Sequence, residues 1–331
     1  MPFFSRTARL ALAGLMTLAL AGCIGSDGDV GSPLVPQRAA ALSRDPTVFV
    51  ATTRLPVGNP LQAPWFSAQR SPDLIFAKAN MKAPDRSMLG RVTLSDWDIR
   101  SVDDVVRKRA AQAFAQEALG QDVVLYIHGY RESFETATVS AAQLSSGIGF
   151  TGVTGLFTWP SAGSTFSYVS DRESAMWSRD ALQDLLTALA NSPSGGRVHI
   201  VAHSMGTLLT LETLRMLRAS GGESAMSRIG AVVLAAPDID IDLFARGVEH
   251  LGADAQKITV ISSTNDRALA VSSRLAGGIV RAGAADRGRL EELGVKVADA
   301  SDFGGGIINH DLFLSNKDVQ QVIKRAIERA R

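Results

Sequence analysis

A stretch in the second half of the chain, from Arg197 to Leu211, has the residue types and spacing of a nucleophilic serine at a sharp turn. It reads RVHIVAHSMGTLLTL, in which an apolar alternation typical of a β-strand is followed at once by helical spacing. Ser204 stands between the two, with Ala202 before it and Gly206 after it. The strained backbone of a nucleophile elbow requires such small residues, because larger ones collide with the neighbouring strand or helix. We therefore expect the Ser204 Oγ to be exposed at a helix N-terminus, where N–H groups favour negative charge.

If Ser204 is a nucleophile, it needs a general base. The alternative is that Ser204 is only a helix N-cap, a role that requires no base. The chain contains five histidines. His310 is favoured because it follows the last predicted strand on a glycine-rich loop, residues 304–309, that could place an imidazole over the serine. The other four lie inside a predicted strand, at strand ends or at a helix end; they are His128, His199, His203 and His250.

The acid that orients the base has two candidates in the sequence. Asp266 comes just after the predicted strand Ile258–Ser263, in the sequence SSTND, and is the favoured choice. Asp238 comes just after the preceding predicted strand, in the sequence APD, and remains the alternative acid. Asp238 could instead serve the N-terminus of a helix predicted over Ile239–Leu251.

An oxyanion hole needs two N–H donors about 3 Å from the developing charge. The backbone N–H of Met205, directly after the serine, is one expected donor. The other is the N–H of Tyr130, in the His-Gly-Tyr sequence that follows the predicted strand Val123–His128. The remaining interpretation of that sequence is a simple turn.

Alternating strand-like and helical segments predict the elements that position these residues. This order favours an α/β fold with a mostly parallel sheet and helices on both faces. The predicted strands are Thr47–Thr53, Leu89–Ser95, Val123–His128, Gly152–Thr158, Val198–His203, Ile229–Ala235, Ile258–Ser263 and Val295–Ala300. The clearest predicted helices are Val102–Leu119, Glu173–Ala190, Thr207–Arg218 and Val319–Ala330. Ser204 thus follows the fifth of about eight strands, and the order serine, acid, histidine is that of the α/β-hydrolase fold.

Seven short motifs add to this pattern: Val48–Arg54, Ile127–Tyr130, Trp159–Gly163, Ala202–Gly206, Ala236–Asp238, Asn265–Leu269 and Asn309–His310. Through them the chain, from Thr47 to its C-terminus, resembles a bacterial α/β-hydrolase family of the esterase/lipase superfamily, formerly a domain of unknown function. The resemblance implies the fold and a hydrolytic triad, and it implies no particular substrate.

The N-terminus has the features of a lipoprotein signal. Two arginines precede an apolar run, Leu10–Ala21, that is shorter than the roughly 20 residues of a membrane-spanning helix. The run ends in Leu-Ala-Gly-Cys, which resembles a lipobox with Cys23 as the lipidated residue. We therefore expect a signal peptide over 1–22, a flexible tether over 23–45, and a catalytic domain over 46–331 in the bacterial envelope. The outer membrane, facing the periplasm, is the favoured location because Ile24 stands where inner-membrane lipoproteins often carry aspartate.

Composition and missing motifs exclude other classes. A formal net charge of +1 gives no reason to expect nucleic acid as a partner, and no pattern identifies a protein partner. The sequence predicts no metal site and no cofactor, since its single cysteine is assigned to the anchor and phosphate-binding fingerprints are missing. Only one helix is predicted where many relatives carry a cap domain. With few apolar runs in the covering loops, this predicts an open pocket for short acyl chains.

These observations predict a serine hydrolase that cleaves small carboxylic esters through an acyl-enzyme and is held on a membrane by Cys23. The same triad would serve a thioesterase, an amidase or an acyltransferase. A different class of protein also remains open, namely a non-catalytic envelope lipoprotein that uses a hydrolase scaffold for binding.

Overall fold

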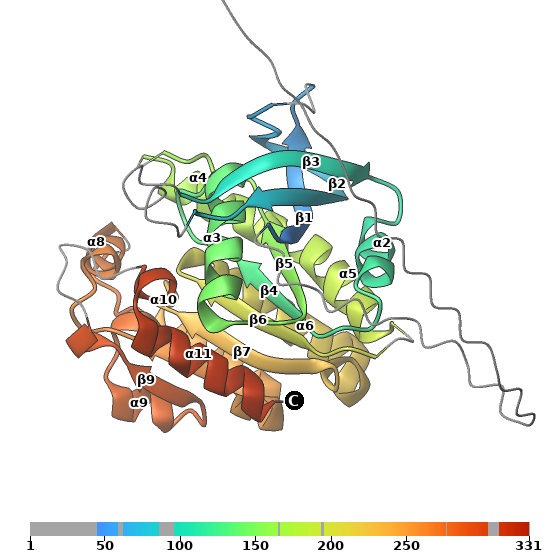
Figure 1. Ribbon diagram of the computed structural model, residues 1–331. Helices are drawn as coiled ribbons and strands as arrows, with labels where there is room; N and C mark the ends of the chain where they lie inside the picture. The colour runs from blue at the N-terminus through green and yellow to red at the C-terminus, as the bar shows by residue number, and fades with distance from the viewer. Residues whose placement is uncertain are drawn as a thin grey trace, which may run out of the picture. The chain divides into compact units, whose positions relative to one another are not determined.

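A nine-stranded sheet forms the centre of the part of the protein that the computed structural model describes (Figure 1). The described residues are 45–58, 62–85, 96–164, 166–192, 195–275, 277–303 and 311–330. The strands are β1 Thr47–Pro56, β2 Phe66–Lys82, β3 Asp98–Val106, β4 Val123–Ile127, β5 Val153–Thr158, β6 Val198–His203, β7 Ile229–Ala235, β8 Ile258–Ser262 and β9 Lys296–Asp299. Their order across the sheet is β3-β2-β1-β5-β4-β6-β7-β8-β9.

Seven neighbouring strands, from β1 to β9 in that order, run parallel, whereas β2 and β3 add an antiparallel edge. The central strands β4, β5, β6, β7 and β8 are buried along their whole length. Continuous apolar runs are typical of parallel strands that are covered on both faces. Because these strands run parallel, their carboxyl ends meet at one edge of the sheet, where ligands of open α/β sheets bind.

Helices cover both faces of the sheet, as the sequence predicted. They are α2 Ala110–Glu117, α3 Phe134–Ile148, α4 Tyr168–Trp177, α5 Arg179–Ala190, α6 Met205–Met226, α7 Ile241–Leu251, α8 Arg267–Leu275, α9 Arg287–Glu291, α10 Leu312–Ser315 and α11 Lys317–Arg329. Short 3-10 helices occupy Gly252–Lys257, Ala282–Ala284 and Ser301–Phe303.

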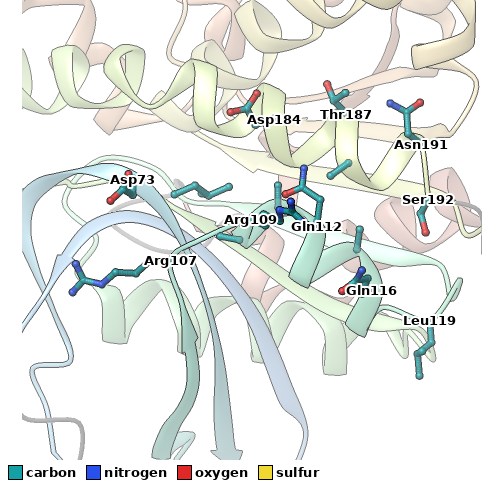
Figure 2. A pocket seen from close by; sticks show the side chains of 15 residues that line it. Asp73, Arg107, Arg109, Gln112, Gln116, Leu119, Asp184, Thr187, Asn191 and Ser192 are labelled. Carbon is teal, nitrogen blue, oxygen red and sulfur yellow. The ribbon is translucent and has the colours of Figure 1, made fainter.

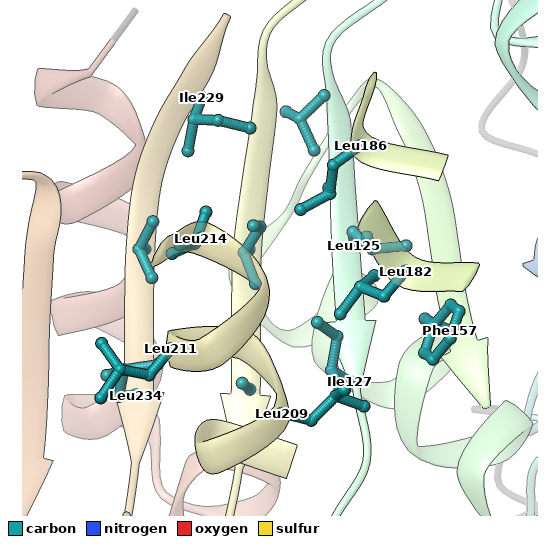
Figure 3. Packing of buried hydrophobic residues seen from close by; sticks show 14 of the residues in the cluster. Leu125, Ile127, Phe157, Leu182, Leu186, Leu209, Leu211, Leu214, Ile229 and Leu234 are labelled. Atoms are coloured by element: carbon teal, nitrogen blue, oxygen red, sulfur yellow. The ribbon is translucent and has the colours of Figure 1, made fainter. Parts of the chain in front are cut away.

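Alternate residues of each strand pack on opposite helix layers. Leu125 and Ile127 of β4 join the cluster formed with α2, α5, α6 and α7 (Figure 3). Val124 and Tyr126 of the same strand join the cluster formed with α3, α10 and α11. Both clusters and all nine described strands lie within one compact unit, Arg44–Arg331, so this segment contains a complete core.

The antiparallel edge corrects two predictions. The residues expected to begin a helix at Val102 belong instead to β3, and α2 starts only at Ala110, after Arg109 in a left-handed conformation (φ 55°). The strand β2 was missed because its first half is exposed and polar, so it carries little apolar alternation. The predicted strand Leu89–Ser95 lies outside the described residues. Among the described strands, Ser204 follows the sixth of nine, whereas the sequence predicted the fifth of eight.

Two helix predictions also change in their bounds. The segment predicted as one helix over Glu173–Ala190 is two helices, α4 and α5, which meet at Ser178. The buried Ser178 hydroxyl lies 2.8 Å from the Thr53 hydroxyl of β1 and ties this junction to the sheet. Helix α6 continues past the predicted end at Arg218, and a kink at Gly222 (φ 59°) separates it from the last residues up to Met226.

No large cap domain interrupts the described fold between β7 and β8. That connection holds α7 and one short 3-10 helix, in agreement with the sequence. Within the described part of the chain, no helix is both long and apolar enough to cross a bilayer.

Candidate active site

Ser204 occupies a sharp turn between β6 and α6. Its backbone has a positive φ of 49° with ψ −120°, a conformation that costs a non-glycine residue about 1–3 kcal/mol. The strain is held by hydrogen bonds: its N–H donates to the Ala235 carbonyl (3.0 Å), and its carbonyl accepts from the Thr207 N–H (3.0 Å). The Ser204 side chain makes no capping hydrogen bond to α6, which argues against a simple N-cap. This is the backbone geometry of a nucleophile elbow.

Close packing around this turn explains why it needs small residues. A Cβ on Gly206 would lie 2.3 Å from the His128 carbonyl oxygen, at the end of β4. A Cβ on Gly129 would lie 2.9 Å from the Cβ of Ser204. Ala202 is fully buried in β6. Because the loop after β4 packs directly against the serine, Ser204 is only 3% exposed, which corrects the expectation of an open Oγ.

The two predicted oxyanion donors belong to segments that adjoin Ser204. Met205 is the first residue of α6, where backbone N–H groups have no acceptor within the helix. Tyr130 follows Gly129 in the loop that packs on the serine. The Tyr130 hydroxyl donates to the Ser164 carbonyl (2.9 Å), which joins this loop to the one after β5.

His128 supports the same loop and is unsuitable as the base. Its Nε2 accepts from the Trp159 N–H (3.0 Å), so Nδ1 carries the proton and donates to the Gly129 carbonyl (2.8 Å). The ring is fully buried and stacks on the Trp159 indole, with centroids 4.7 Å apart. Burial, reinforced by the nearby Arg54 charge, holds the pKa of His128 well below its usual value. His128 is therefore a neutral structural group.

Arg54 is a functional candidate whose role the sequence did not reveal. Its guanidinium is buried at the end of β1 and donates to the Thr158 hydroxyl (2.9 Å), the Ser161 carbonyl (3.1 Å) and the Glu132 carbonyl (2.6 Å). It thereby fixes the loops that follow both β4 and β5. Burial lowers its pKa to about 10. The sequence signal for this role was the position of Arg54, a charged residue at the end of an apolar strand, in the first of the seven motifs.

Asp266 lies at the carboxyl edge, four residues after β8 ends. It is buried, and its Oδ1 accepts from the N–H groups of Ala268 (2.9 Å) and Leu269 (3.1 Å) at the start of α8. These bonds fix the orientation of the carboxylate.

Asp238, the alternative acid, is committed to a buried ion pair. Its carboxylate lies 3.1 Å from Nε of Arg281, and both side chains are 3% exposed. It also accepts hydrogen bonds from the hydroxyls of Ser272 and Tyr168, the latter at 2.9 Å. The N-terminus of α7 is capped by Asp240 instead. Asp238 therefore does not cap α7, and its role as the alternative acid stays a prediction.

His310 and Cys23 lie outside the described residues. The residue after His310 is described: the Asp311 carboxylate lies 3.6 Å from Nε2 of His203, the residue before Ser204. The His203 ring packs on Phe313 and is buried. The remaining histidines are placed as expected, His199 buried within β6 and His250 exposed on α7.

Other features of the described structure lie apart from the elbow. A cavity of about 870 Å³ lies between α2 and α5, and its polar lining includes Arg107, Gln112, Asp184 and Asn191 (Figure 2). None of the predicted site residues lines it. Among the described side chains, no group of three or more His, Cys, Asp or Glu could hold a metal ion.

Comparisons with known proteins give a short curated sequence match and similarities to several solved structures. The curated match, the uncharacterized protein alr1448 of a Nostoc species, is 34% identical over 61 residues, which is 18% of this chain and 16% of that protein. An uncharacterized Bacillus cereus structure is similar with a TM-score of 0.41 and 15% identity, covering 65% of this chain and 60% of that one. The catalytic core domain of an acetyl xylan esterase from Trichoderma reesei is similar with a TM-score of 0.38 and 13% identity, covering 63% of this chain and 98% of that one. An esterase from Pyrobaculum calidifontis is similar with a TM-score of 0.34 and 13% identity, covering 77% of this chain and 78% of that one.

The family comparison covers most of the chain. A family described as "Alpha/beta hydrolase of unknown function (DUF900)" matches residues 106–327, a range that includes Ser204, Asp266 and His310. Together with the nine-stranded, mostly parallel sheet, this match shows that the chain belongs to the DUF900 family of alpha/beta hydrolases.

Proposed function

We propose that this alpha/beta hydrolase cleaves carboxylic esters with Ser204 as its nucleophile. The observation that carries the proposal is the strained backbone of Ser204 (φ 49°, ψ −120°) at the turn between β6 and α6. A non-glycine residue in such a conformation is costly, and strain of this kind concentrates at functional sites. The close approach of Gly129 to Ser204 supports the N–H of Tyr130, the next residue of that loop, as the second oxyanion donor.

The proposed reaction runs in two balanced steps. His310 removes the proton of the Ser204 hydroxyl while Oγ attacks the ester carbonyl; the protonated imidazole then gives that proton to the leaving alcohol, which leaves an acyl-enzyme. Water gives a proton to His310 and attacks the acyl-enzyme; the protonated imidazole returns that proton to Ser204 Oγ as the carboxylic acid leaves. The N–H groups of Met205 and Tyr130 stabilise the negative oxygen in both steps.

Two contacts support the other assignments. His310 precedes Asp311 in the sequence, and the Asp311 carboxylate lies 3.6 Å from Nε2 of His203, the chain neighbour of Ser204; this supports His310 as the proposed base. Asp266 uses Oδ1 to cap α8, and we assign its Oδ2 to the imidazole of His310.

The tethering of the enzyme to the bacterial envelope belongs to the same proposal. The Leu-Ala-Gly-Cys sequence that ends at Cys23 supports it. Acyl chains on Cys23 would hold the enzyme on the membrane, since each buried CH₂ contributes about 0.8 kcal/mol.

Labelling with a fluorophosphonate tests the proposal. The probe should add one group to the protein, on the peptide that contains Ser204, and heat-denatured protein and the Ser204→Ala variant should remain unlabelled. Natively folded protein without a label, or a label on another peptide, would overturn the assignment.

A further inference from the structure

A cavity at the amino ends of the parallel strands is lined by charges of one sign. It has a volume of about 520 Å³ and lies where β6, β7, β8 and β9 begin, against α11. The whole chain holds 34 basic and 33 acidic residues, so composition alone does not explain this concentration of one sign. We call this cavity the basic groove, and its five charged lining residues are Arg197, Lys257, Lys296, Arg325 and Arg329.

The topology places the basic groove away from the proposed ester site. Strands β6 to β9 run parallel, so their first residues share one edge of the sheet, whereas the elbow follows the other end of β6. Arg197 directly precedes β6, Lys257 directly precedes β8, and Lys296 is the first residue of β9. Helix α11 contacts β7 (Figure 1) and supplies Arg325 and Arg329 from its last two turns.

Most of these charges have no acidic partner among the described residues. Only Lys257 forms an ion pair there, with Asp254 (2.8 Å). The Lys296 ammonium and the Arg197 guanidinium donate to backbone carbonyls at 2.7 and 3.4 Å, which hold them in place without a counter-charge. The nearby Asp122 carboxylate accepts the backbone N–H of Arg197 (2.9 Å), not its side chain. Four of the five cations therefore keep their charge available to a ligand.

One face of α11 lines the groove. Its members are spaced at i, i+3, i+4, i+7 and i+8: Val322, Arg325, Ala326, Arg329 and Ala330. The two acids of this helix, Asp318 and Glu328, are exposed and do not line the groove. Ile229 and Val297 of the sheet also line it, so the groove combines cations with apolar side chains.

Two other cavities of the described structure mix their charges. The cavity between α2 and α5 is lined by two acids and two arginines, and a cavity on α7 is lined by two acids and one arginine. Like charges gathered around one hollow repel one another and lower the stability of the fold. A bound anion would offset that repulsion in the basic groove.

We propose that the basic groove binds a small organic molecule that carries two or more phosphate groups. Guanidinium groups match the oxygens of phosphate in pairs. Each phosphate group carries a charge of about −1.5 to −2 at neutral pH, so two of them supply about the charge that the four cations lack, whereas a carboxylate supplies only one. The volume lies within the range of small-molecule sites, and the apolar lining suits the organic part of the ligand. This ligand is separate from the ester substrate, so the inference goes beyond the proposed function.

The test is isothermal titration calorimetry of the full-length protein with pyrophosphate in metal-free buffer. Pyrophosphate should bind one site, more weakly as salt is added, and orthophosphate should bind about tenfold or more weakly by comparison. Arg325→Gln combined with Arg329→Gln should weaken pyrophosphate binding by about tenfold or more, because two charge-assisted hydrogen-bond donors are lost. The matched control is Lys317→Gln with Lys324→Gln, which removes two positive charges from the same helix outside the groove and should bind as the wild type does.

Three results would overturn the proposal. They are no binding of pyrophosphate, an equal loss in the control variant, or tighter binding of a short DNA duplex or of phosphatidic acid vesicles than of pyrophosphate, which would assign the groove to a macromolecule or a membrane. Thermal unfolding without ligand checks that both variants are folded. The proposed function fails separately: wild type that binds pyrophosphate without fluorophosphonate labelling refutes only the esterase, while labelling without pyrophosphate binding refutes only the groove.

Discussion

Adding a single methyl group at Gly129 should disable the site without unfolding the protein. The ideal Cβ of an alanine there would lie 2.9 Å from the Ser204 Cβ and 2.9 Å from Nδ1 of His203. Carbon atoms in ordinary contact are about 3.5–4.0 Å apart, so the loop and the serine must separate by about 0.6–1 Å. The predicted oxyanion donor, the Tyr130 N–H, would move with this loop.

The size of the effect follows from that displacement. A misplacement of about 1 Å in a catalytic site costs about 10²-fold, and loss of one oxyanion donor costs about 10²–10³-fold in kcat. Overpacking of this kind destabilises a fold by about 1–3 kcal/mol, which a domain of this size tolerates. We therefore expect Gly129→Ala to reduce kcat/KM by about 10²–10³-fold in a protein that still unfolds cooperatively.

The assay is hydrolysis of p-nitrophenyl butyrate, with urea unfolding measured on the same samples. Gly58→Ala is the matched control, because its Cβ would meet nothing within 4 Å and its φ is not positive. It should leave both activity and stability unchanged. If Gly129→Ala retains wild-type activity while Ser204→Ala is inactive, the His-Gly-Tyr loop is not the oxyanion loop.

Three further predictions concern the acid, the buried histidine and the anchor. Asp266→Asn should lower kcat in a protein that stays stable. Asp238→Asn should mainly lower the melting temperature, because it leaves Arg281 buried without its counter-charge at a cost of about 3–5 kcal/mol. A larger fall in kcat from Asp238→Asn than from Asp266→Asn would reverse the assignment of the acid. The pKa of His128 is lowered in the folded state, so the folded protein binds fewer protons than the unfolded chain, and the free energy of unfolding should fall as the pH drops below about 6.5, by at most about 1.4 kcal/mol per pH unit. His128→Gln should reduce this pH dependence. Equal slopes in the wild type and the variant would contradict a neutral His128. Full-length protein should fractionate with membranes and incorporate labelled fatty acid, and Cys23→Ala should not incorporate it; soluble, unacylated wild type would refute the anchor.

The elbow and the central sheet could be predicted because their signals are local. The strand β6 is a continuous buried run, and the small residues around Ser204 are required by contacts within a few ångströms of the turn. The strands β4, β5, β7 and β8 carry the same apolar signal, so their positions matched the predictions to within a residue or so.

The rest depends on contacts between segments far apart in the chain. Asp238 and Asp266 occupy similar positions in the sequence, since each follows a buried strand. Their surroundings differ, because Asp238 pairs with Arg281 whereas Asp266 accepts hydrogen bonds from the start of α8. Arg54 is a lone charge at a strand end until the loops after β4 and β5 bring their carbonyls to it. The strand β2 is too polar to be recognised without its partners β1 and β3.

The central claim, that Ser204 is activated by His310, is tested most directly by kinetics of the single and double variants. Ser204→Ala and His310→Ala should each reduce kcat on p-nitrophenyl butyrate by about 10³-fold or more, and the double variant should lose little beyond either one, because triad members act as a unit. Retained activity in folded Ser204→Ala, or losses that multiply in the double variant, would contradict the account.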